Sequence, residues 1–388
     1  MKAVFINDHP FYVNNTGGIF TSGTLDSSVW SRFTDNFGSL TVIGRGIALE
    51  SDKHSHKSAN AEHVSFDLFM NVNGGKDYFK YGKEIKLKLE KYIRDSDYVI
   101  IRLPSNIGVM AASICKKLGK KYFVEVVGCA FDSLWYYGGL TSKLFAPVNY
   151  VKTKVAVRNA TSAVYVTKDY LQKRYPNPNP SINASNVVIE HFGQEVLADH
   201  LKRLDKASGI KKIGMIGNVG LAYKGYEILF QALSTINISY ELSIVGGGDP
   251  KWINNLIKKY GLDNKVKILG RFNERNKIYE FLDDLDLYVQ PSLTEGLPRS
   301  VIEAMARACP VIASDAGGIP ELISKGFVYK RKDAKQLAEL IRKVIVDVSL
   351  LKKMSEENFE TSKEYTFEVI KDRRNNFLQS IKENIKNL

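Results

Sequence analysis

Two glutamates, Glu295 and Glu303, stand at the ends of the segment EGLPRSVIE. Carboxylates accept hydrogen bonds from hydroxyl groups, and the free N–H groups at the start of a helix favour anions. Two carboxylates on either side of such a helix start would suit a ligand with hydroxyls at both ends and phosphate in the middle, as in a nucleotide sugar. The alternative is a pair of solvated glutamates near a helix N-terminus, where negative charge is favourable in any case.

The surrounding residues predict a strand, a turn and a helix that would position these carboxylates. Leu285–Gln290 is a short apolar run that suits a buried parallel strand, and Pro291–Leu297 has the composition of a turn. Pro298 is expected at the first helical position, because its missing N–H would be unbonded there anyway. Ligands of open α/β sheets bind at the carboxyl ends of strands, so Glu295 in the turn and Glu303 in the helix become candidate ligand residues.

The run from Pro291 to Ile323, PSLTEGLPRSVIEAMARACPVIASDAGGIPELI, resembles the Glu-x(7)-Glu element of retaining glycosyltransferases with the GT-B fold, family four in the usual sequence classification. The resemblance implies that Glu295 holds hydroxyls of the donor sugar and that Glu303 holds the ribose of the nucleotide. It also implies that the backbone after the first glutamate contacts the sugar and the phosphates. These backbone contacts are expected from Gly296, Leu297 and Pro298.

Lys224 is the candidate phosphate-binding cation. It stands with Gly225 before a predicted helix and resembles the phosphate-binding lysine of the family. The family pattern usually has an arginine five or six residues earlier, whereas this chain has Asn218, which supplies no charge. Donor diphosphate binding would therefore depend mainly on Lys224, and plain surface solvation is the alternative for this lysine.

Two further pairs are expected at the donor site because of the resemblance. Arg271 and Phe272 follow a predicted strand, Val266–Gly270, in the segment that lies beside the base in the family. Gly17 and Gly18 follow a first strand, predicted at Lys2–Asn7, and would face the donor phosphates. An ordinary turn is the alternative for the glycine pair, because glycine is frequent in turns of every kind.

The catalytic histidine of many family members is missing from this chain. Val127 and Gly128 occupy the end of the strand where that histidine would stand. Asp132 is the nearest polar residue and is the candidate for a catalytic role. The next stretch, Leu134–Asn149, is aromatic and apolar, and is expected to form an acceptor-facing or lipid-facing loop, or to serve packing alone.

No metal site is predicted. His54 and His56 could bind a metal from a strand, but no third ligand is nearby. Asp284-Leu285-Asp286 spells the Asp-x-Asp signature of metal-dependent glycosyltransferases of the other major fold, but it straddles a predicted helix end and strand start. Lys224 and the amides at Gly296–Pro298 are therefore expected to stabilise the leaving diphosphate instead of a metal.

The length of 388 residues predicts two domains, and strands alternate with helices along the chain. The predicted fold class is α/β, of the GT-B type with two Rossmann-like domains facing a central cleft. An N-terminal acceptor-binding domain is expected over residues 1–195, with a linker near 193–210, and a nucleotide-sugar-binding domain over 196–365. A C-terminal helix over 366–388 is expected to cross back to the N-terminal domain.

The net charge of +13 favours anionic partners: nucleic acid, phosphate substrates or an acidic membrane surface. A basic amphipathic helix predicted at Asp77–Arg94 would either pack its apolar stripe on a sheet or be drawn to anionic lipid. Three cysteines without metal spacing suit a reducing cytoplasm, and no apolar run is long enough to span a bilayer. We therefore expect a cytoplasmic chain at the inner face of the cell membrane. Nucleic-acid binding would rest on net charge alone, so nucleic acid is not an expected partner.

The predicted function is retaining transfer of a sugar from a UDP- or GDP-sugar to a hydroxyl of a glycan or lipid-linked glycan, in the synthesis of surface polysaccharide or lipopolysaccharide. No cofactor is expected. In the front-face mechanism proposed for the family, the leaving phosphate takes the acceptor proton, which tolerates the missing histidine. A non-catalytic GT-B partner subunit and a GT-B sugar-nucleotide epimerase are the alternatives. A Rossmann oxidoreductase is disfavoured, since no Gly-x-Gly-x-x-Gly follows a strand with an acidic residue about twenty positions on.

Overall fold

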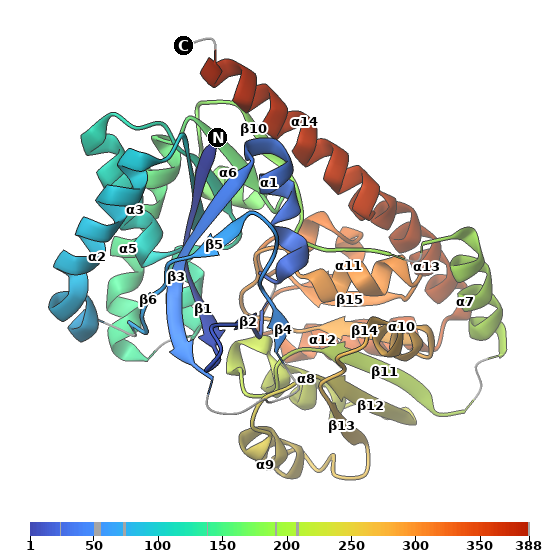
Figure 1. Cartoon of the computed structure of the whole chain (residues 1–388). Coiled ribbons are helices and arrows are strands. Elements are labelled where there is room, and N and C mark those ends of the chain that lie inside the picture. The colour runs from blue at the N-terminus through green and yellow to red at the C-terminus, as the bar shows by residue number, and fades with distance from the viewer. Residues whose placement is uncertain are drawn as a thin grey trace. The chain divides into compact units, whose positions relative to one another are not determined.

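The computed structural model describes residues 1–23, 25–49, 56–72, 75–137, 139–190, 192–206 and 209–386. The chain forms two compact units, each a sheet flanked by helices (Figure 1). The first unit comprises Met1–Phe131, Pro147–Ala184 and Lys371–Leu388, and the second comprises Asp132–Ala146 and Ser185–Ile370.

The first unit is built on a mainly parallel sheet of strand order β10-β9-β8-β7-β1-β2-β4. β3 also pairs with β1, and β5 and β6 pair with β3. Its strands are β1 (Lys2–Val13), β2 (Ile19–Thr21), β3 (Ser39–Ala48), β4 (Lys57–Ser58), β5 (Val64–Phe66), β6 (Phe69–Met70), β7 (Tyr98–Leu103), β8 (Phe123–Val126), β9 (Ser162–Tyr165) and β10 (Ser181–Asn183). Its helices are α1 (Ser31–Phe37), α2 (Gly75–Asp95), α3 (Asn106–Leu118) and α6 (Tyr170–Arg174).

Three expectations for this part of the chain are corrected by the structure. β1 continues past Asn7 to Val13 and pairs with the antiparallel β2, so that the glycine pair lies in a hairpin turn. The sequence also allows a single helix over Thr24–Phe37, but the structure has a short 3-10 turn followed by α1, and Thr24 lies outside the described residues.

The third correction concerns Leu134–Asn149, which is not a loop. It forms the end of α4 (Ala130–Tyr137) and the first half of α5 (Leu140–Arg158), a continuous helix that contains Pro147. Proline usually interrupts a helix, but α5 continues through Pro147.

The predicted basic helix forms as α2. Ile85 and Leu89 are buried, together with Ile93. The apolar stripe of α2 is therefore packed in the core of the first unit, which is the packing alternative of the two that the sequence left open. Among the described residues, no helix is long and apolar enough to cross a membrane.

The second unit is a six-stranded parallel sheet of order β13-β12-β11-β14-β15-β16. Its strands are β11 (Lys211–Ile216), β12 (Tyr240–Val245), β13 (Val266–Gly270), β14 (Leu287–Gln290), β15 (Val311–Ser314) and β16 (Val328–Tyr329). Its helices are α7 (Gln194–Lys206), α8 (Tyr226–Leu233), α9 (Lys251–Lys259), α10 (Arg275–Asp283), α11 (Arg299–Ala306), α12 (Ala334–Ile345) and α13 (Val348–Ser362), and α14 (Phe367–Lys386) begins there.

The strand order places a topological switch point between β11 and β14. From β11 the chain moves outward to β12 and β13, and then returns to the other side of β11 to form β14, β15 and β16. Loops that leave neighbouring strands in opposite directions open a crevice at the carboxyl ends of those strands, where ligands of such sheets bind. The loop after β11 carries Lys224, and the loop after β14 carries Glu295.

The boundary between the units falls at Ala184/Ser185, before the boundary predicted at 195/196. Residues beyond Ala184 pack with the second unit: the ring of Phe192 stacks on Phe359 at 4.6 Å between centroids, and Glu190 forms an ion pair with Arg275. At the other end of the chain, Lys371–Leu388 belongs to the first unit.

The anchor of this last segment is a buried ion cluster. Arg374 donates to Glu125 at 2.9 Å, and Arg32 and Arg102 lie 3.4 and 3.5 Å from the same carboxylate. Burial alone would raise the pKa of Glu125, but the charges of the three arginines hold it below its usual value.

Candidate active site

Lys224 and Glu295 meet at the switch point. The Lys224 Nζ lies 2.8 Å from Glu295 Oε1, and the two side chains are only 17% and 12% exposed. Burial alone would lower the pKa of Lys224, but the charge and hydrogen bond of Glu295 raise it above its usual value. The structure thus holds a charged lysine and a carboxylate side by side at the carboxyl ends of β11 and β14.

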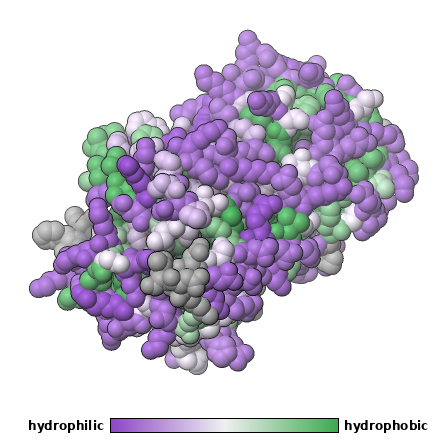
Figure 2. Space-filling model, turned by 90° about the horizontal axis from the view of Figure 1, so that it is seen from above, coloured by the Kyte–Doolittle hydropathy of each residue, from purple (hydrophilic) through white to green (hydrophobic). Residues whose placement is uncertain are grey.

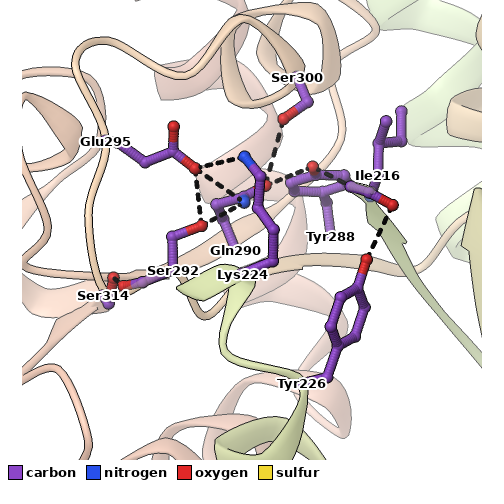
Figure 3. A network of polar contacts seen from close by, with 10 residues as sticks. Ile216, Lys224, Tyr226, Tyr288, Gln290, Ser292, Glu295, Ser300 and Ser314 are labelled. Carbon is purple, nitrogen blue, oxygen red and sulfur yellow. Dashed lines mark hydrogen bonds and ion pairs between the residues drawn. The ribbon is translucent and has the colours of Figure 1, made fainter. Parts of the chain in front are cut away.

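A chain of buried and partly buried hydrogen bonds leads to the Glu295 carboxylate (Figure 3). Ser292 donates to Glu295 Oε1 at 2.7 Å and accepts from Gln290 Nε2 at 2.8 Å. Gln290 Oε1 in turn accepts from the Tyr288 hydroxyl at 2.6 Å and from Ser300 at 3.2 Å. Every donor in this chain has a fixed partner, so the carboxylate is oriented before any ligand arrives. Sequence analysis did not single out Gln290 or Ser292.

Two glycines let neighbouring loops touch the loop that carries Glu295. Gly225 has φ +79°, and a Cβ there would lie 1.9 Å from the Pro291 carbonyl oxygen. Gly317 has φ +60°, and a Cβ there would lie 2.0 Å from the Glu295 carbonyl oxygen. Both positions need a left-handed backbone and no side chain. The Glu295 loop is therefore clamped between the loop after β11 and the loop after β15.

Arg331 fastens the same loop from a distant part of the chain. Its guanidinium donates to the Leu293 carbonyl at 3.1 Å, to Asp315 Oδ1 at 2.9 Å and to the Asp315 carbonyl at 2.8 Å. This residue joins the loops after β14 and β15 and lies just beyond β16. No local motif in the sequence predicted that Arg331 would contact the Glu295 loop.

Helix α11 begins directly after the Glu295 loop. Pro298 is the N-cap residue, whereas the sequence predicted it at the first helical position, which Arg299 takes. No side chain caps the helix. The free N–H groups of the first turn therefore point to where an anion would be stabilised. Gly296 and Leu297 lie between Glu295 and this helix start, and the Gly296 carbonyl accepts from Gly318 N at 2.7 Å.

Glu303 follows on the same helix. Burial raises the pKa of its carboxyl group, while the charges of Arg299 and Arg275 act in the opposite direction. Within the described part of the chain, no side chain or backbone group donates a hydrogen bond to this carboxylate. Its oxygens are available to hydroxyl donors of a ligand.

The other residues predicted at the donor side follow the carboxyl ends of β11 and β13. Asn218 accepts from Gly220 N at 2.8 Å through its side-chain oxygen, so this part of the amide is used to shape its own loop. Arg271 follows β13 and lies against Gly247, with the Cβ of Arg271 3.7 Å from where a Gly247 Cβ would be. The ring of Phe272 makes an edge contact with Phe281.

Gly17 and Gly18 were predicted to face the donor phosphates, and Asp132 was predicted to have a catalytic role. The two glycines lie in the first unit, in the β1–β2 turn that Asn14 closes by accepting from Gly18 N at 2.7 Å. Asp132 is buried in the first turn of α4, where its charge acts on Arg331. Their predicted roles in donor binding and catalysis stay predictions.

The Asp-x-Asp sequence precedes the amino end of β14, whereas Glu295 follows its carboxyl end, and both aspartates have structural partners. Asp286 is buried just before β14 and accepts from Lys212 N at 2.7 Å and from Arg203 at 3.1 Å. Asp284 pairs with the Lys212 ammonium at 2.6 Å. His54 lies outside the described residues, and over the described ranges no group of three or more His, Cys, Asp or Glu side chains is placed to hold a metal ion.

The chain is similar in sequence to known proteins. Residues 198–361 match the family model described as glycosyl transferases group 1. Protein CapJ of Staphylococcus aureus is 34% identical over 390 residues, which cover 98% of this chain and 96% of CapJ. An N-acetylgalactosamine-N,N'-diacetylbacillosaminyl-diphospho-undecaprenol 4-alpha-N-acetylgalactosaminyltransferase of Campylobacter jejuni is 26% identical over 243 residues, 60% of this chain and 61% of that protein.

Among solved structures, HepE of Anabaena in complex with UDP-glucose superposes with a TM-score of 0.67 at 17% identity, over 98% of this chain and all of that one. The expected α/β fold class of the GT-B type is thereby confirmed.

Proposed function

Because the chain belongs to the glycosyl transferases group 1 family, it is a glycosyltransferase, and we propose that it transfers a sugar from a UDP- or GDP-sugar to a lipid-linked glycan, with retention of the anomeric configuration, during synthesis of a surface polysaccharide. One observation carries the proposal. Lys224 and Glu295 meet at the switch point of the second unit, and Glu303 follows on the uncapped helix α11.

The donor is held in this proposal by three parts of the site. Lys224 and the N-terminus of α11 bind the diphosphate, because both carry positive charge toward the same loop. Glu295 accepts hydrogen bonds from sugar hydroxyls, and Glu303 accepts them from the ribose. Gln290 and Ser292 hold the Glu295 carboxylate in place, so little orientation has to be established when the donor binds.

The chemical step follows from the same arrangement. The bond between the anomeric carbon and the diphosphate oxygen breaks, and a bond forms between that carbon and the acceptor hydroxyl oxygen on the same face. The acceptor proton passes to the leaving diphosphate oxygen. Lys224 and the α11 N-terminus stabilise the charge that develops on the diphosphate, and such preorganised stabilisation is usually the largest part of catalysis.

A lipid-linked acceptor at the cytoplasmic face of the membrane is supported by two observations. The Campylobacter jejuni relative is named for a diphospho-undecaprenol acceptor. The chain also carries a net charge of +13, which favours substrates with phosphate groups and an anionic membrane surface.

Nucleotide binding is the first experiment. The wild type and Glu303→Ala would be heated with UDP, GDP, ADP or CDP. A nucleotide at a hundred times its dissociation constant adds about 2.7 kcal/mol to stability, which is roughly 5–10 °C in melting temperature for a unit of this size. We expect UDP or GDP to stabilise the wild type and Glu303→Ala to lose that shift. Glu339→Ala, an exposed position on α12, is the matched control and should keep it.

Product analysis tests the rest. The anomeric proton coupling of the product, read by NMR against that of the donor, reports whether configuration is retained. An inverted product would overturn the front-face mechanism. A wild type that no nucleotide stabilises would overturn the proposed donor site itself and favour a partner-subunit role.

A further inference from the structure

Half of the large apolar side chains exposed in the described structure are gathered in one short stretch. There are sixteen such side chains, and eight of them lie between Trp135 and Val155. They are Trp135, Tyr137, Leu140, Leu144, Phe145, Val148, Val151 and Val155. By contrast, the face of the molecule in Figure 2 is mostly hydrophilic, with apolar side chains in separate patches. An exposed apolar surface of this density marks an interaction site.

Five of these side chains form a stripe along α5. At about 100° per residue, Leu140, Leu144, Val148, Val151 and Val155 fall within an arc of about 80° on the helix. Leu140 is 78% exposed and Leu144 is 72% exposed. We call these five residues the α5 stripe.

The opposite side of α5 is already packed. Ala146, Thr153, Ala156 and Val157 are buried. A helix that is apolar on both sides is normally buried on both sides. The α5 stripe is thus a second apolar face, beyond the one that packs the helix against the rest of the protein.

The charged residues of α5 itself are all basic. Lys143, Lys152, Lys154 and Arg158 are exposed on the same helix. The chain has no aspartate or glutamate between Ser133 and Lys168. On the helix, Lys143 and Lys154 flank one side of the stripe, Lys152 flanks the other, and Arg158 closes its end. Long basic side chains can lie along an apolar surface while their charged ends reach outward.

We propose that the α5 stripe and its flanking cations dock the protein on the surface of an anionic phospholipid bilayer. An interfacial helix of this kind lies in the membrane plane, with its apolar face below the headgroups and its basic residues among the anionic phosphates. A symmetric dimer through the same face is disfavoured, because it would set a stretch with four cations and no acid against itself. The proposal deepens the proposed function, since docking would bring the enzyme to its lipid-linked acceptor.

Vesicle flotation tests the proposal without any donor or acceptor. The probes are vesicles of phosphatidylcholine alone and vesicles of equimolar phosphatidylcholine and phosphatidylglycerol. We expect the wild type to float with the anionic vesicles and to be released by salt. The variant Leu140→Ser/Leu144→Ser/Val151→Ser should bind them at least about tenfold more weakly.

Charge reversal tests the flanking cations. Lys143→Glu/Lys152→Glu/Lys154→Glu should lose binding to the anionic vesicles by at least about tenfold and show little response to salt. The matched controls change the same residue types at exposed positions elsewhere: Leu87→Ser/Leu269→Ser/Val346→Ser and Lys258→Glu/Lys335→Glu/Lys343→Glu. Both controls should bind like the wild type.

The outcomes separate docking from donor binding. Retained UDP or GDP stabilisation shows that the stripe variant is folded and has its donor site. Vesicle binding that is unchanged in this folded variant overturns the docking proposal and leaves the proposed function standing. A wild-type dimer that becomes a monomer in the stripe variant, without vesicle binding, also overturns it and assigns the face to self-association. A wild type that binds vesicles but no nucleotide overturns the proposed function alone.

Discussion

The Lys224–Glu295 ion pair offers a test that separates what holds the site together from what binds the donor. Its two side chains are 17% and 12% exposed, so most of the pair is shielded from solvent. Removing one partner of a largely buried pair leaves the other charge uncompensated, which costs about 3 kcal/mol at the lower end of the usual range. Lys224→Met should therefore lower the melting temperature of the ligand-free protein by roughly 6–12 °C.

The double variant Lys224→Met/Glu295→Gln should recover much of that loss. A glutamine at 295 can still accept from Ser292, which lies 2.7 Å from Oε1, and it leaves no buried charge beside the methionine. We expect a coupling energy of about 2 kcal/mol between the two positions in a double-mutant cycle. The unfolding free energies of the wild type, both single variants and the double variant, measured in urea, give this value.

Donor binding should behave differently from stability in the same four proteins. If Lys224 contacts the diphosphate, the double variant regains stability but is still not stabilised by UDP or GDP. A coupling energy near zero would refute the structural pairing of Lys224 with Glu295. A double variant that nucleotide stabilises as it does the wild type would refute the phosphate-binding role of Lys224. Glu295→Gln alone should keep nucleotide binding, because the amide still fills the place of the carboxylate in the loop. It should lose turnover, because the amide no longer supplies the charged acceptor for the sugar hydroxyls.

Three further outcomes follow from the structure. Burial, with Arg203 and Arg307 nearby, lowers the pKa of His200 to about 3 in the folded protein. As pH falls below about 6.5, the histidine of the unfolded chain becomes protonated while the folded one stays neutral. His200 therefore lowers the free energy of unfolding by about 1.4 kcal/mol per pH unit in that range. His200→Leu should flatten that slope in urea unfolding at pH 7 and pH 5, and an unchanged slope would exclude His200 as its source. Gly317→Ala should lower kcat/KM at least about tenfold, because its Cβ would lie 2.0 Å from the Glu295 carbonyl oxygen; Gly326→Ala, with open space around it, should act like the wild type. Glu125→Gln should destabilise the protein by about 3 kcal/mol or more, because three arginines lose their shared carboxylate; a melting curve equal to that of exposed Glu84→Gln would contradict the buried cluster.

The parts of the site that lie close together in sequence could be predicted from it. Strand, turn and helix around Glu295 and Glu303 formed within one or two residues of the predicted bounds. Local rules decide such a segment: a buried apolar strand, a turn-forming composition and a proline at the helix start. Lys224 was also predicted at the site, from the loop after β11, and the sheet order explains why it reaches Glu295.

Residues that reach the site from a distance could not be predicted. Arg331 contacts Leu293 and Asp315 only because β14, β15 and β16 are neighbours in the sheet. Gln290 and Ser292 belong to the predicted strand and turn, but nothing in a single sequence shows that their side chains point at Glu295. The helical state of the first half of α5 was missed for a different reason, because the aromatic and apolar composition of Leu134–Asn149 does not by itself distinguish a loop from a packed helix.

The segment 132–146 shows how far chain order and spatial grouping can differ. It follows β8, a strand of the first unit, yet it belongs to the second. The Tyr137 ring lies 5.7 Å from that of Tyr223, the residue before Lys224, and the Tyr136 ring lies under the cations of Arg331 and Lys332. These two rings touch the residues that position Lys224 and the Glu295 loop. A change at Tyr136 or Tyr137 would therefore act on the loops that carry Lys224 and Glu295, although sequence order assigns α4 to the acceptor side.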